Sequence, residues 1–211
     1  MQDYPRALEA QLEAGAEALG MELSAERRVV LLGYLALLGK WNKAYNLTGV
    51  RDPKAMVTHH LLDSLAVWPY LYGQRLIDVG TGAGLPGMVL ALADPERQWV
   101  LLDSNAKKIR FLTQVLIELK PSNIEIVRAR VEDHRPRCVF DTVITRAFGP
   151  LTWIVQAARH LCANGGRVLA MKGNYPRAEI AQIQEMFLDP AVHRLVVPGL
   201  AAERHLVVLI R

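Results

Sequence analysis

The hydrophobic positions follow two different periods along the chain, and the change falls near residue 72. In the first part, apolar residues recur every three to four positions, which is the period of an amphipathic helix. The predicted helices cover 7–19, 28–44 and 54–71. They predict an N-terminal helical extension, residues 1–72, that packs on the rest of the chain, residues 73–211.

Beyond the segment 72–74, short apolar runs alternate with amphipathic stretches. Strands that alternate with helices form a parallel sheet, so we expect an α/β, doubly wound, mostly parallel fold. Two last strands, 192–197 and 204–210, flank Pro198 and Gly199 and predict an antiparallel hairpin. The elements expected before this hairpin are strand 75–80, helix 86–93, strand 98–103, helix 106–119, strand 124–130, strand 140–146, helix 149–162, strand 166–172 and helix 176–187.

Composition fits one compact domain with a small extension. A chain of 211 residues, 51% of them hydrophobic, can bury a substantial core. It contains no apolar run of about 18 residues, and the start at 1–4 does not lead into a basic and then apolar segment. We therefore expect no membrane association and a cytoplasmic location. Cys138 and Cys162 are expected to be reduced thiols that pack in the interior.

Charge gives a modest indication of an anionic partner. The chain has 25 Lys and Arg against 21 Asp and Glu, a formal net charge of +4. Basic residues gather at the start of one predicted helix and around the third predicted strand, at Lys107, Lys108, Arg110, Arg128, Arg130, Arg135 and Arg137. Such residues bind nucleic-acid phosphates, but lysines on a solvated face with stems that cover apolar surface are the alternative.

The segment 76–87 has the composition of a loop that binds a nucleotide cofactor. An apolar strand with Asp78 near its end is followed at two-residue spacing by Gly80, Gly82 and Gly84. Residues without a Cβ allow positive φ and let the backbone approach a ligand. A carboxylate at this strand end lies in the crevice where open α/β sheets bind ligands. An aspartate that is merely solvated in the turn is the alternative interpretation.

Asp103 ends the second predicted strand, where a carboxylate can accept hydrogen bonds from both ribose hydroxyls. It could instead be the N-cap of helix 106–119, a role that Ser104 or Asn105 fills equally well. The loop also matches the dinucleotide pattern G-x-G-x-x-G. However, the chain has no Tyr-x-x-x-Lys pair, and no histidine is expected at a strand end to assist hydride transfer. Together with the terminal hairpin, this favours an adenosyl-methionine enzyme over a dehydrogenase.

The third and fourth predicted strands end in residues that suit the same cofactor. Val131 could lie on an adenine face, and Glu132 could meet the edge of the ring. Arg146 ends an apolar strand, where an unpaired guanidinium is costly to bury, so an anionic partner is expected. That partner is either a ligand, with the methionine carboxylate favoured, or a structural carboxylate such as Asp78 or Asp141.

The fourth strand end also excludes several methyl-transfer chemistries. Enzymes that methylate amino groups of adenine or cytosine place an Asn/Asp-Pro-Pro-aromatic run there, whereas this chain has the run 145–148, Thr-Arg-Ala-Phe. Carbon-5 methylation of pyrimidines needs a thiolate nucleophile, and no cysteine is expected at a strand's carboxyl end. A substrate that is already nucleophilic remains, so no catalytic general base is expected. Metal binding is not expected either, because the adjacent His59 and His60 point about 100° apart on a helix.

The chain resembles the bacterial small-subunit ribosomal RNA guanine-N7 methyltransferases, also called the glucose-inhibited division protein B family. The resemblance covers nearly the whole length, through segments 40–48, 60–64, 78–87, 101–104, 130–132, 145–148, 171–173 and 203–208. It implies a class I methyltransferase fold, S-adenosyl-L-methionine as cofactor, and N7-methylguanosine in 16S ribosomal RNA as product. It also implies cofactor contacts at Gly80, Leu85, Val131, Glu132 and Arg146.

Candidate contacts to RNA complete the prediction. Trp41, Tyr45 and Leu47 can simply dock the N-terminal helices, which leaves Asn46 among the residues free for RNA. The further candidates are Lys107, Lys108, Arg128, Lys172 and Arg204. We expect a monomer that acts on small-subunit ribosomal RNA, alone or in the assembled subunit. The alternatives are a methyltransferase for another RNA or a small molecule, and an adenosyl-methionine-binding RNA chaperone without turnover.

Overall fold

The computed structural model describes residues 5–147, 149–183 and 190–211. Its N-terminal part is helical, as the hydrophobic period predicts. The elements are α1 (Arg6–Ala18), α2 (Ala25–Tyr45), α3 (Pro53–Met56), a π-helical turn (Val57–Leu62), α4 (Asp63–Leu65) and a 3₁₀ turn (Trp68–Tyr70). Ser24 and Asp52 cap α2 and α3 by accepting hydrogen bonds from backbone N–H groups. One continuous helix over 54–71 is wrong, because Pro69 disfavours α-helical continuation and the chain makes a separate 3₁₀ turn there.

The described residues form a seven-stranded sheet in the order β3-β2-β1-β4-β5-β7-β6. The first five strands are parallel, and β7 runs antiparallel between β5 and β6, which confirms the predicted fold class and terminal hairpin. The strands are β1 (Arg75–Val79), β2 (Gln98–Asp103), β3 (Ile124–Arg128), β4 (Phe140–Arg146), β5 (Cys162–Lys172), β6 (Ala191–Arg194) and β7 (His205–Ile210). The helices are α5 (Gly87–Ala93), α6 (Ala106–Leu119), α7 (Leu151–Ala158) with a 3₁₀ turn (Arg159–Leu161), and α8 (Arg177–Ile183).

Several predicted boundaries need correction. Helix 149–162 stops earlier, and β5 begins at Cys162, which is therefore a buried strand residue and not the end of a helix. Cys138 is exposed in the connection between β3 and β4, so the expectation that it packs in the interior is wrong. The predicted helix 176–187 begins as α8, and its last four residues lie outside the described residues, as does the predicted N-terminal start at 1–4.

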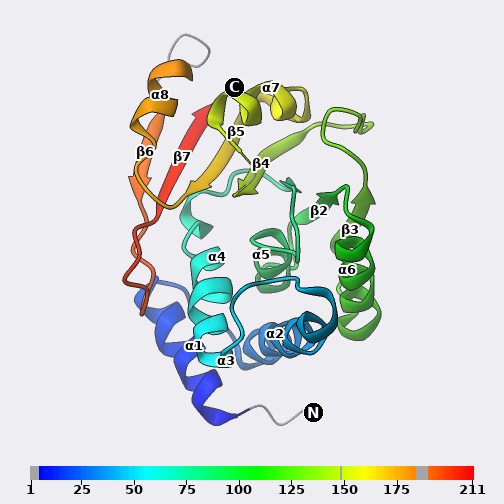
Figure 1. The fold of residues 1–211 in the computed structure, drawn as a ribbon, viewed down its shortest axis with the longest axis vertical. Helices are drawn as coiled ribbons and strands as arrows, with labels where there is room; N and C mark the ends of the chain where they lie inside the picture. The colour runs from blue at the N-terminus through cyan, green and yellow to red at the C-terminus, as the bar shows by residue number, and fades with distance from the viewer. Residues whose placement is uncertain (1–4, 148, 184–189) are drawn as a thin grey trace.

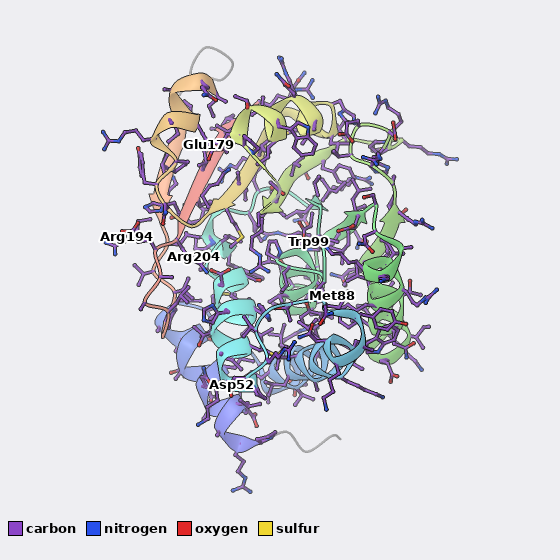
Figure 2. All side chains as sticks on the ribbon, in the orientation of Figure 1. Asp52, Met88, Trp99, Glu179, Arg194 and Arg204 are labelled. Carbon is purple, nitrogen blue, oxygen red and sulfur yellow. The ribbon has the colours of Figure 1, made fainter. Side chains whose placement is uncertain are left out.

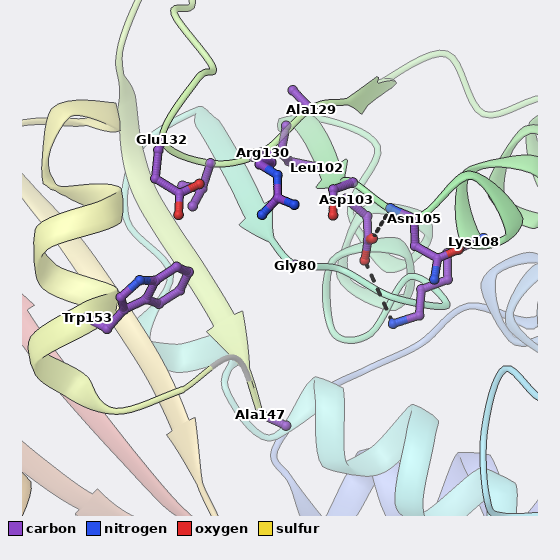
Figure 3. Close-up of a pocket in the computed structure, with 12 residues that line it drawn as sticks. Gly80, Leu102, Asp103, Asn105, Lys108, Ala129, Arg130, Glu132, Ala147 and Trp153 are labelled. Atoms are coloured by element: carbon purple, nitrogen blue, oxygen red, sulfur yellow. Dashed lines mark hydrogen bonds and ion pairs between the residues drawn. The ribbon is translucent and has the colours of Figure 1, made fainter.

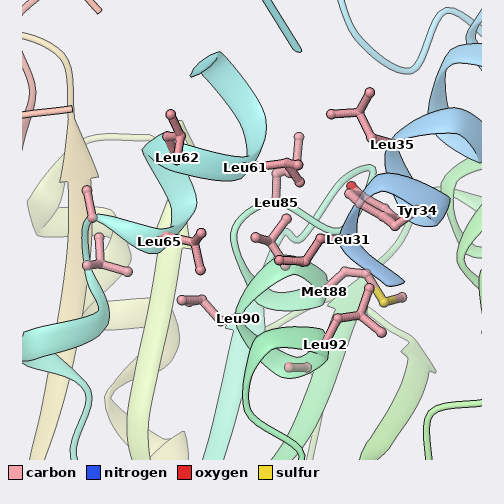
Figure 4. Packing of buried hydrophobic residues seen from close by; sticks show 14 of the residues in the cluster. Leu31, Tyr34, Leu35, Leu61, Leu62, Leu65, Leu85, Met88, Leu90 and Leu92 are labelled. Carbon is pink, nitrogen blue, oxygen red and sulfur yellow. The ribbon is translucent and has the colours of Figure 1, made fainter. Parts of the chain in front are cut away.

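The sheet separates two hydrophobic clusters, and the period-2 alternation of its strands supplies both. On β2, Trp99 and Leu101 belong to one cluster, and Val100 and Leu102 to the other. The N-terminal helices, α5 and α6 cover the first face, whereas α7 and α8 cover the second (Figure 1). The first cluster runs without a break from the N-terminal helices into α5 (Figure 4). It also includes Phe111 and Leu112 of α6. The division into an extension and a domain stays a prediction.

No helix among the described residues is both long and apolar enough to cross a membrane.

Candidate functional site

The glycine loop joins β1 to α5, and the side chain of Asp78 holds it by hydrogen bonds. Asp78 is fully buried, and its Oδ2 accepts hydrogen bonds from the Thr81 hydroxyl at 2.6 Å and the Gly87 N–H at 2.8 Å. The other oxygen, Oδ1, has no hydrogen-bond partner among the described residues. Burial raises the pKa of Asp78 to about 6. The alternative of a solvated turn aspartate is wrong, because the carboxylate has no exposed surface.

Some of the predicted loop residues lie where a ligand can reach them, and others pack against the rest of the protein. Gly80 and Gly82 have φ values of 69° and 63°, which favour glycine. A Cβ on Gly84 would lie 2.6 Å from the Cβ of Met88, so this glycine lets the loop pack on α5. Leu85 is buried in the first cluster. These positions keep the loop close to the sheet, while Gly80 faces an open cleft.

An N-terminal residue also supports the loop. The hydroxyl of Tyr34, on α2, donates a 2.8 Å hydrogen bond to the carbonyl oxygen of Ala83 in a fully buried position. Figure 4 shows Tyr34 on its helix beside Leu85 and Met88. Sequence reasoning missed this contact, because the two residues are 49 positions apart and nothing local marks Tyr34.

Asp103 ends β2 and lies against the same loop. Its Oδ2 accepts a 2.9 Å hydrogen bond from the Gly82 N–H, and its Oδ1 accepts one of 2.8 Å from the Asn105 N–H. The N-cap of α6 is Asn105, whose side chain accepts from two backbone N–H groups, so the capping alternative for Asp103 is wrong. Lys108 Nζ lies 4.0 Å from Asp103 Oδ2. Both Asp103 oxygens retain lone pairs that can accept further bonds.

These residues line a cleft of about 370 Å³ at the carboxyl edge of the sheet, the Asp103 cleft (Figure 3). Its lining is Gly80, Leu102, Asp103, Ser104, Asn105, Lys108, Ala129, Arg130, Val131, Glu132, Ala147 and Trp153. Four predicted cofactor residues are therefore brought together, from three different strand ends. Lys108, predicted for RNA, also lies here. In Figure 3 the Trp153 ring of α7 stands across the cleft from Asp103, and no sequence pattern pointed to it.

A second cavity adjoins the cleft at Ala147, which lines both. We call it the arginine pocket; it measures about 400 Å³ and is lined by Asp63, Arg146, Ala147, Met171, Lys172, Gly173 and Arg204. Arg146 Nη1 lies 3.0 Å from Asp63 Oδ2, and Arg204 Nε lies 2.7 Å from Asp63 Oδ1. Figure 2 places Arg204 beside α4, which begins with Asp63.

The structural partner of Arg146 differs from both carboxylates that the sequence suggested. Asp141 accepts hydrogen bonds from the backbone N–H groups of Gln74 and Arg75, away from Arg146. Asp78 bonds to the loop. Asp63 is the partner, and only its place within the resembling segment 60–64 could have drawn attention to it.

The other candidates for RNA contact do not gather in one place. Lys172 Nζ pairs with Glu179 at 2.8 Å and donates to the Gly149 carbonyl. Lys107 and Arg128 are exposed, at the start of α6 and the end of β3. Asn46 is the left-handed C-cap of α2, with φ 49°. Whether these residues touch RNA stays a prediction.

The segment 40–48 has the docking role that was one of its two interpretations. Trp41 stacks on Tyr45 at 5.1 Å between ring centroids and lies 5.9 Å from the Phe111 ring of α6. Asn42 closes the following turn by two hydrogen bonds to the backbone of Thr48.

The histidines need one correction. His193 lies in β6 and His205 opens β7, so the expectation of no histidine at a strand end is wrong. His205 Nδ1 is 3.0 Å from the Gly173 carbonyl, which anchors the strand edge. Neither histidine lines the cleft or the arginine pocket. Within the described ranges no cluster of His, Cys, Asp and Glu could hold a metal.

Comparison with known proteins gives a specific match. Residues 28–207 match the profile of the family described as rRNA small subunit methyltransferase G. The chain is 52% identical over 202 residues to the Ribosomal RNA small subunit methyltransferase G of Pseudomonas aeruginosa, covering 95% of this chain and 94% of the relative. It is 50% identical over 208 residues to the protein of the same name from Nitrosospira multiformis, covering 95% and 96%.

Solved structures with low sequence identity share the fold. The N-methyltransferase NodS from Bradyrhizobium japonicum, in complex with S-adenosyl-L-homocysteine, superimposes with a TM-score of 0.56 at 11% identity and covers 82% of this chain and 98% of its own. An rRNA methylase from Streptococcus thermophilus gives a TM-score of 0.51 at 18% identity, covering 71% and 93%.

Proposed function

The chain belongs to the rRNA small subunit methyltransferase G family, and on that premise we propose that it transfers a methyl group from S-adenosyl-L-methionine to N7 of a guanine in small-subunit (16S) ribosomal RNA. One observation supports this most strongly: the cleft lined by the Asp103 carboxylate meets a pocket with two arginines at Ala147, on the same edge of the sheet. Cofactor and acceptor need this adjacency, since the methyl group passes directly between them.

The residues of the Asp103 cleft fit the cofactor. Asp103 has lone pairs for the ribose hydroxyls, and Gly80 leaves the floor of the cleft without a Cβ. Val131 and Glu132 line the wall on which the adenine would lie. Arg146 would hold the methionine carboxylate from the neighbouring pocket, because its donors besides Nη1 can bind an anion. Asp78, Gly82, Gly84 and Leu85 would act by fixing the loop.

S-adenosyl-L-methionine supplies an electrophilic methyl group on a sulfonium. Guanine N7 has an in-plane lone pair and no proton, so its attack needs alignment but no general base. An arginine that binds guanine O6 and N7 together would block this lone pair. Any arginine that reads the base must therefore hold O6 alone, or bind a phosphate.

The protein's contribution to the reaction is orientation and electrostatics. The Asp103 cleft fixes the cofactor, and the arginine pocket supplies positive charge beside it. For RNA we propose that Asn46, Lys107, Lys108, Arg128, Lys172 and Arg204 make the contacts. We also propose that the protein acts as a monomer, and a ribosomal RNA substrate in bacterial relatives supports work in the cytoplasm.

Methyl transfer to defined substrates tests this function. The test combines the purified protein and labelled adenosyl-methionine with one of two substrates, naked 16S ribosomal RNA or assembled small subunits. The nucleosides of the RNA are then separated. We expect one N7-methylguanosine per RNA, in at least one of the two substrates. Label in another nucleoside would favour another acceptor. RNA binding without any label would favour a chaperone.

A further inference from the structure

Asp63 carries a buried negative charge that is shared between two arginines. It has 1% of its surface exposed, and its two oxygens pair with different guanidinium groups. Arg146 comes from β4, and Arg204 lies directly before β7. Asp63 itself comes from the N-terminal helices. One carboxylate thus fixes the relative position of two cations that come from different parts of the chain.

The charges of the pocket do not cancel. Lys172 is paired with Glu179, whereas Arg146 and Arg204 share the single charge of Asp63. These paired groups leave one positive charge at the pocket. Arg204 uses Nε for Asp63 and Nη1 for the Glu203 carbonyl, so within the described residues its Nη2 keeps its protons for another acceptor. The side chain of Arg204 is about a quarter exposed, at 23%.

We propose that Arg204, held in place by Asp63, binds a backbone phosphate of the RNA next to the target guanosine, and that Asp63 is the positioning residue for both arginines. This inference rests on the proposed function. Arg146 and Arg204 can each bind an anion, and the proposed reaction brings two anions to the site: the cofactor carboxylate and an RNA phosphate. Both arginines line the arginine pocket, but Arg146 directly precedes Ala147, which also lines the Asp103 cleft, whereas Arg204 precedes β7, two strands away from β4. We therefore assign Arg204, and not Arg146, to the phosphate.

A phosphodiester matches this pocket in charge and geometry. It is an anion, and the paired groups leave the pocket with a net positive charge. Guanidinium groups hold phosphate oxygens by directional, charge-assisted hydrogen bonds, and a shared carboxylate keeps such a group in one orientation before the ligand arrives. A phosphate contact also leaves guanine N7 free, as the methyl transfer requires.

The decisive variant is Arg204→Gln, with Arg75→Gln as its matched control. Arg75 is the first residue of β1, at the end of the strands opposite to their carboxyl ends, so its substitution removes the same charge far from the pocket. Affinity for 16S ribosomal RNA is measured without cofactor over a range of salt concentrations, and affinity for adenosyl-methionine is measured by calorimetry without RNA. Arg204→Gln should weaken RNA binding by about tenfold or more and lower the slope of log Kd against log salt by about 0.7, for one phosphate contact.

In the same measurements the cofactor affinity of Arg204→Gln should equal that of the wild type. A loss of cofactor affinity with an unchanged salt slope would overturn the assignment of Arg204 to phosphate. An equal loss of slope in Arg75→Gln would overturn it too, because the effect would then be one of total charge. Neither binding experiment needs methyl transfer, so absence of N7-methylguanosine with the wild type would reject the function and leave the phosphate assignment to be judged separately.

Asp63→Asn tests the positioning role. It should raise KM for both RNA and adenosyl-methionine, while kcat at saturation stays near the wild-type value, because both arginines lose their fixed position. A purely structural role would lower the active fraction, and thus kcat, without changing either KM; that result would overturn the positioning claim. If Asp63→Asn does not fold, Asp63→Glu keeps the charge, displaces it by one methylene and is judged by the same two KM values.

Discussion

The Asp103 cleft and the arginine pocket share Ala147 but are assembled in different ways. In the cleft, Asp103 bonds to the backbone of Asn105, two residues on, and of Gly82, 21 residues before. In the pocket, Asp63 meets arginines that lie 83 and 141 residues further along the chain. Contacts between residues close in the sequence therefore hold Asp103, whereas Asp63 meets its partners only when the N-terminal helices, β4 and the final strands have come together.

The two regions also treat buried carboxylates differently. Asp63 is paired with two guanidinium groups, while Asp78 under the glycine loop receives hydrogen bonds from a hydroxyl and a backbone N–H. Desolvation raises the pKa of Asp78 to about 6, and the groups that bond to it among the described residues are neutral. Burial at the loop thus favours the neutral form of Asp78, whereas the pocket places two guanidinium groups directly against a carboxylate.

We expect the largest effect in the pH dependence of the free energy of unfolding, through the titration of Asp78. The folded-state pKa of about 6 exceeds the ordinary value of 3.8, so the folded protein binds more protons between these values than the unfolded chain. The free energy of unfolding should therefore fall as pH rises from about 4 to about 6, by up to about 3 kcal/mol from this group. Denaturant unfolding of the wild type and Asp78→Asn at pH 4 and pH 7 isolates the contribution.

The asparagine variant is a close control for this measurement. Its carbonyl oxygen can accept the bonds from Thr81 and Gly87, and its amide nitrogen replaces the oxygen that has no partner among the described residues. The other titrating groups are the same in both proteins. An identical pH dependence for the two would show that Asp78 does not titrate in this range.

The next effect should be confined to the cleft. Asp103→Ala should lower affinity for adenosyl-methionine by about 10- to 150-fold, since a hydrogen bond to a charged group contributes about 1.5–3 kcal/mol. Affinity for RNA should stay nearly unchanged, because Asp103 is absent from the arginine pocket. Calorimetry with the cofactor measures the loss. An unchanged affinity would reject the ribose assignment. Fraying of α6 would not explain a loss of cofactor affinity, because the N-cap of this helix is Asn105.

Four of the residues that the sequence assigned to the cofactor lie together in the cleft, and that they bind it stays a prediction. The spacing of Gly80 and Gly82 and the position of Asp103 after an apolar strand follow from rules that act over a few residues. The order of strands and helices likewise follows from hydrophobic periods. Parallel strands then bring their carboxyl ends to one edge, which is how Glu132 and Asp103 come to line the same cleft.

The arginine pocket could not be predicted in the same way. Asp63 lies in an N-terminal helix whose sequence shows only an amphipathic period, and no spacing rule connects it to Arg146 or Arg204. The sequence indicated correctly that Arg146 needs an anionic partner, since a guanidinium at an apolar strand end is costly alone. It could not identify that partner, because the choice depends on how helices from another part of the chain pack on the sheet.

Arg146 directly precedes Ala147, which lines both cavities, and its substitution tests whether it binds the cofactor or the acceptor. Arg146→Lys keeps the charge but loses the planar donor geometry, so KM for adenosyl-methionine should rise roughly tenfold if the residue binds the methionine carboxylate. Turnover should be largely recovered at saturating cofactor. Equilibrium dialysis measures the binding directly. Wild-type cofactor affinity with a turnover defect that excess cofactor does not rescue would assign Arg146 to the acceptor instead.

The smallest effect concerns Trp153, which stands across the cleft from Asp103 (Figure 3). If its indole packs against the adenine, Trp153→Ala should weaken adenosyl-methionine binding by about 2- to 12-fold, the value of about 0.5–1.5 kcal/mol for an aromatic pair. Trp153→Phe should keep most of the affinity, because a ring remains. RNA affinity and its salt slope should not change, since Trp153 lines the cleft and not the arginine pocket. A variant that binds cofactor normally but RNA poorly would instead mean that a base of the RNA, and not the cofactor, lies against this ring.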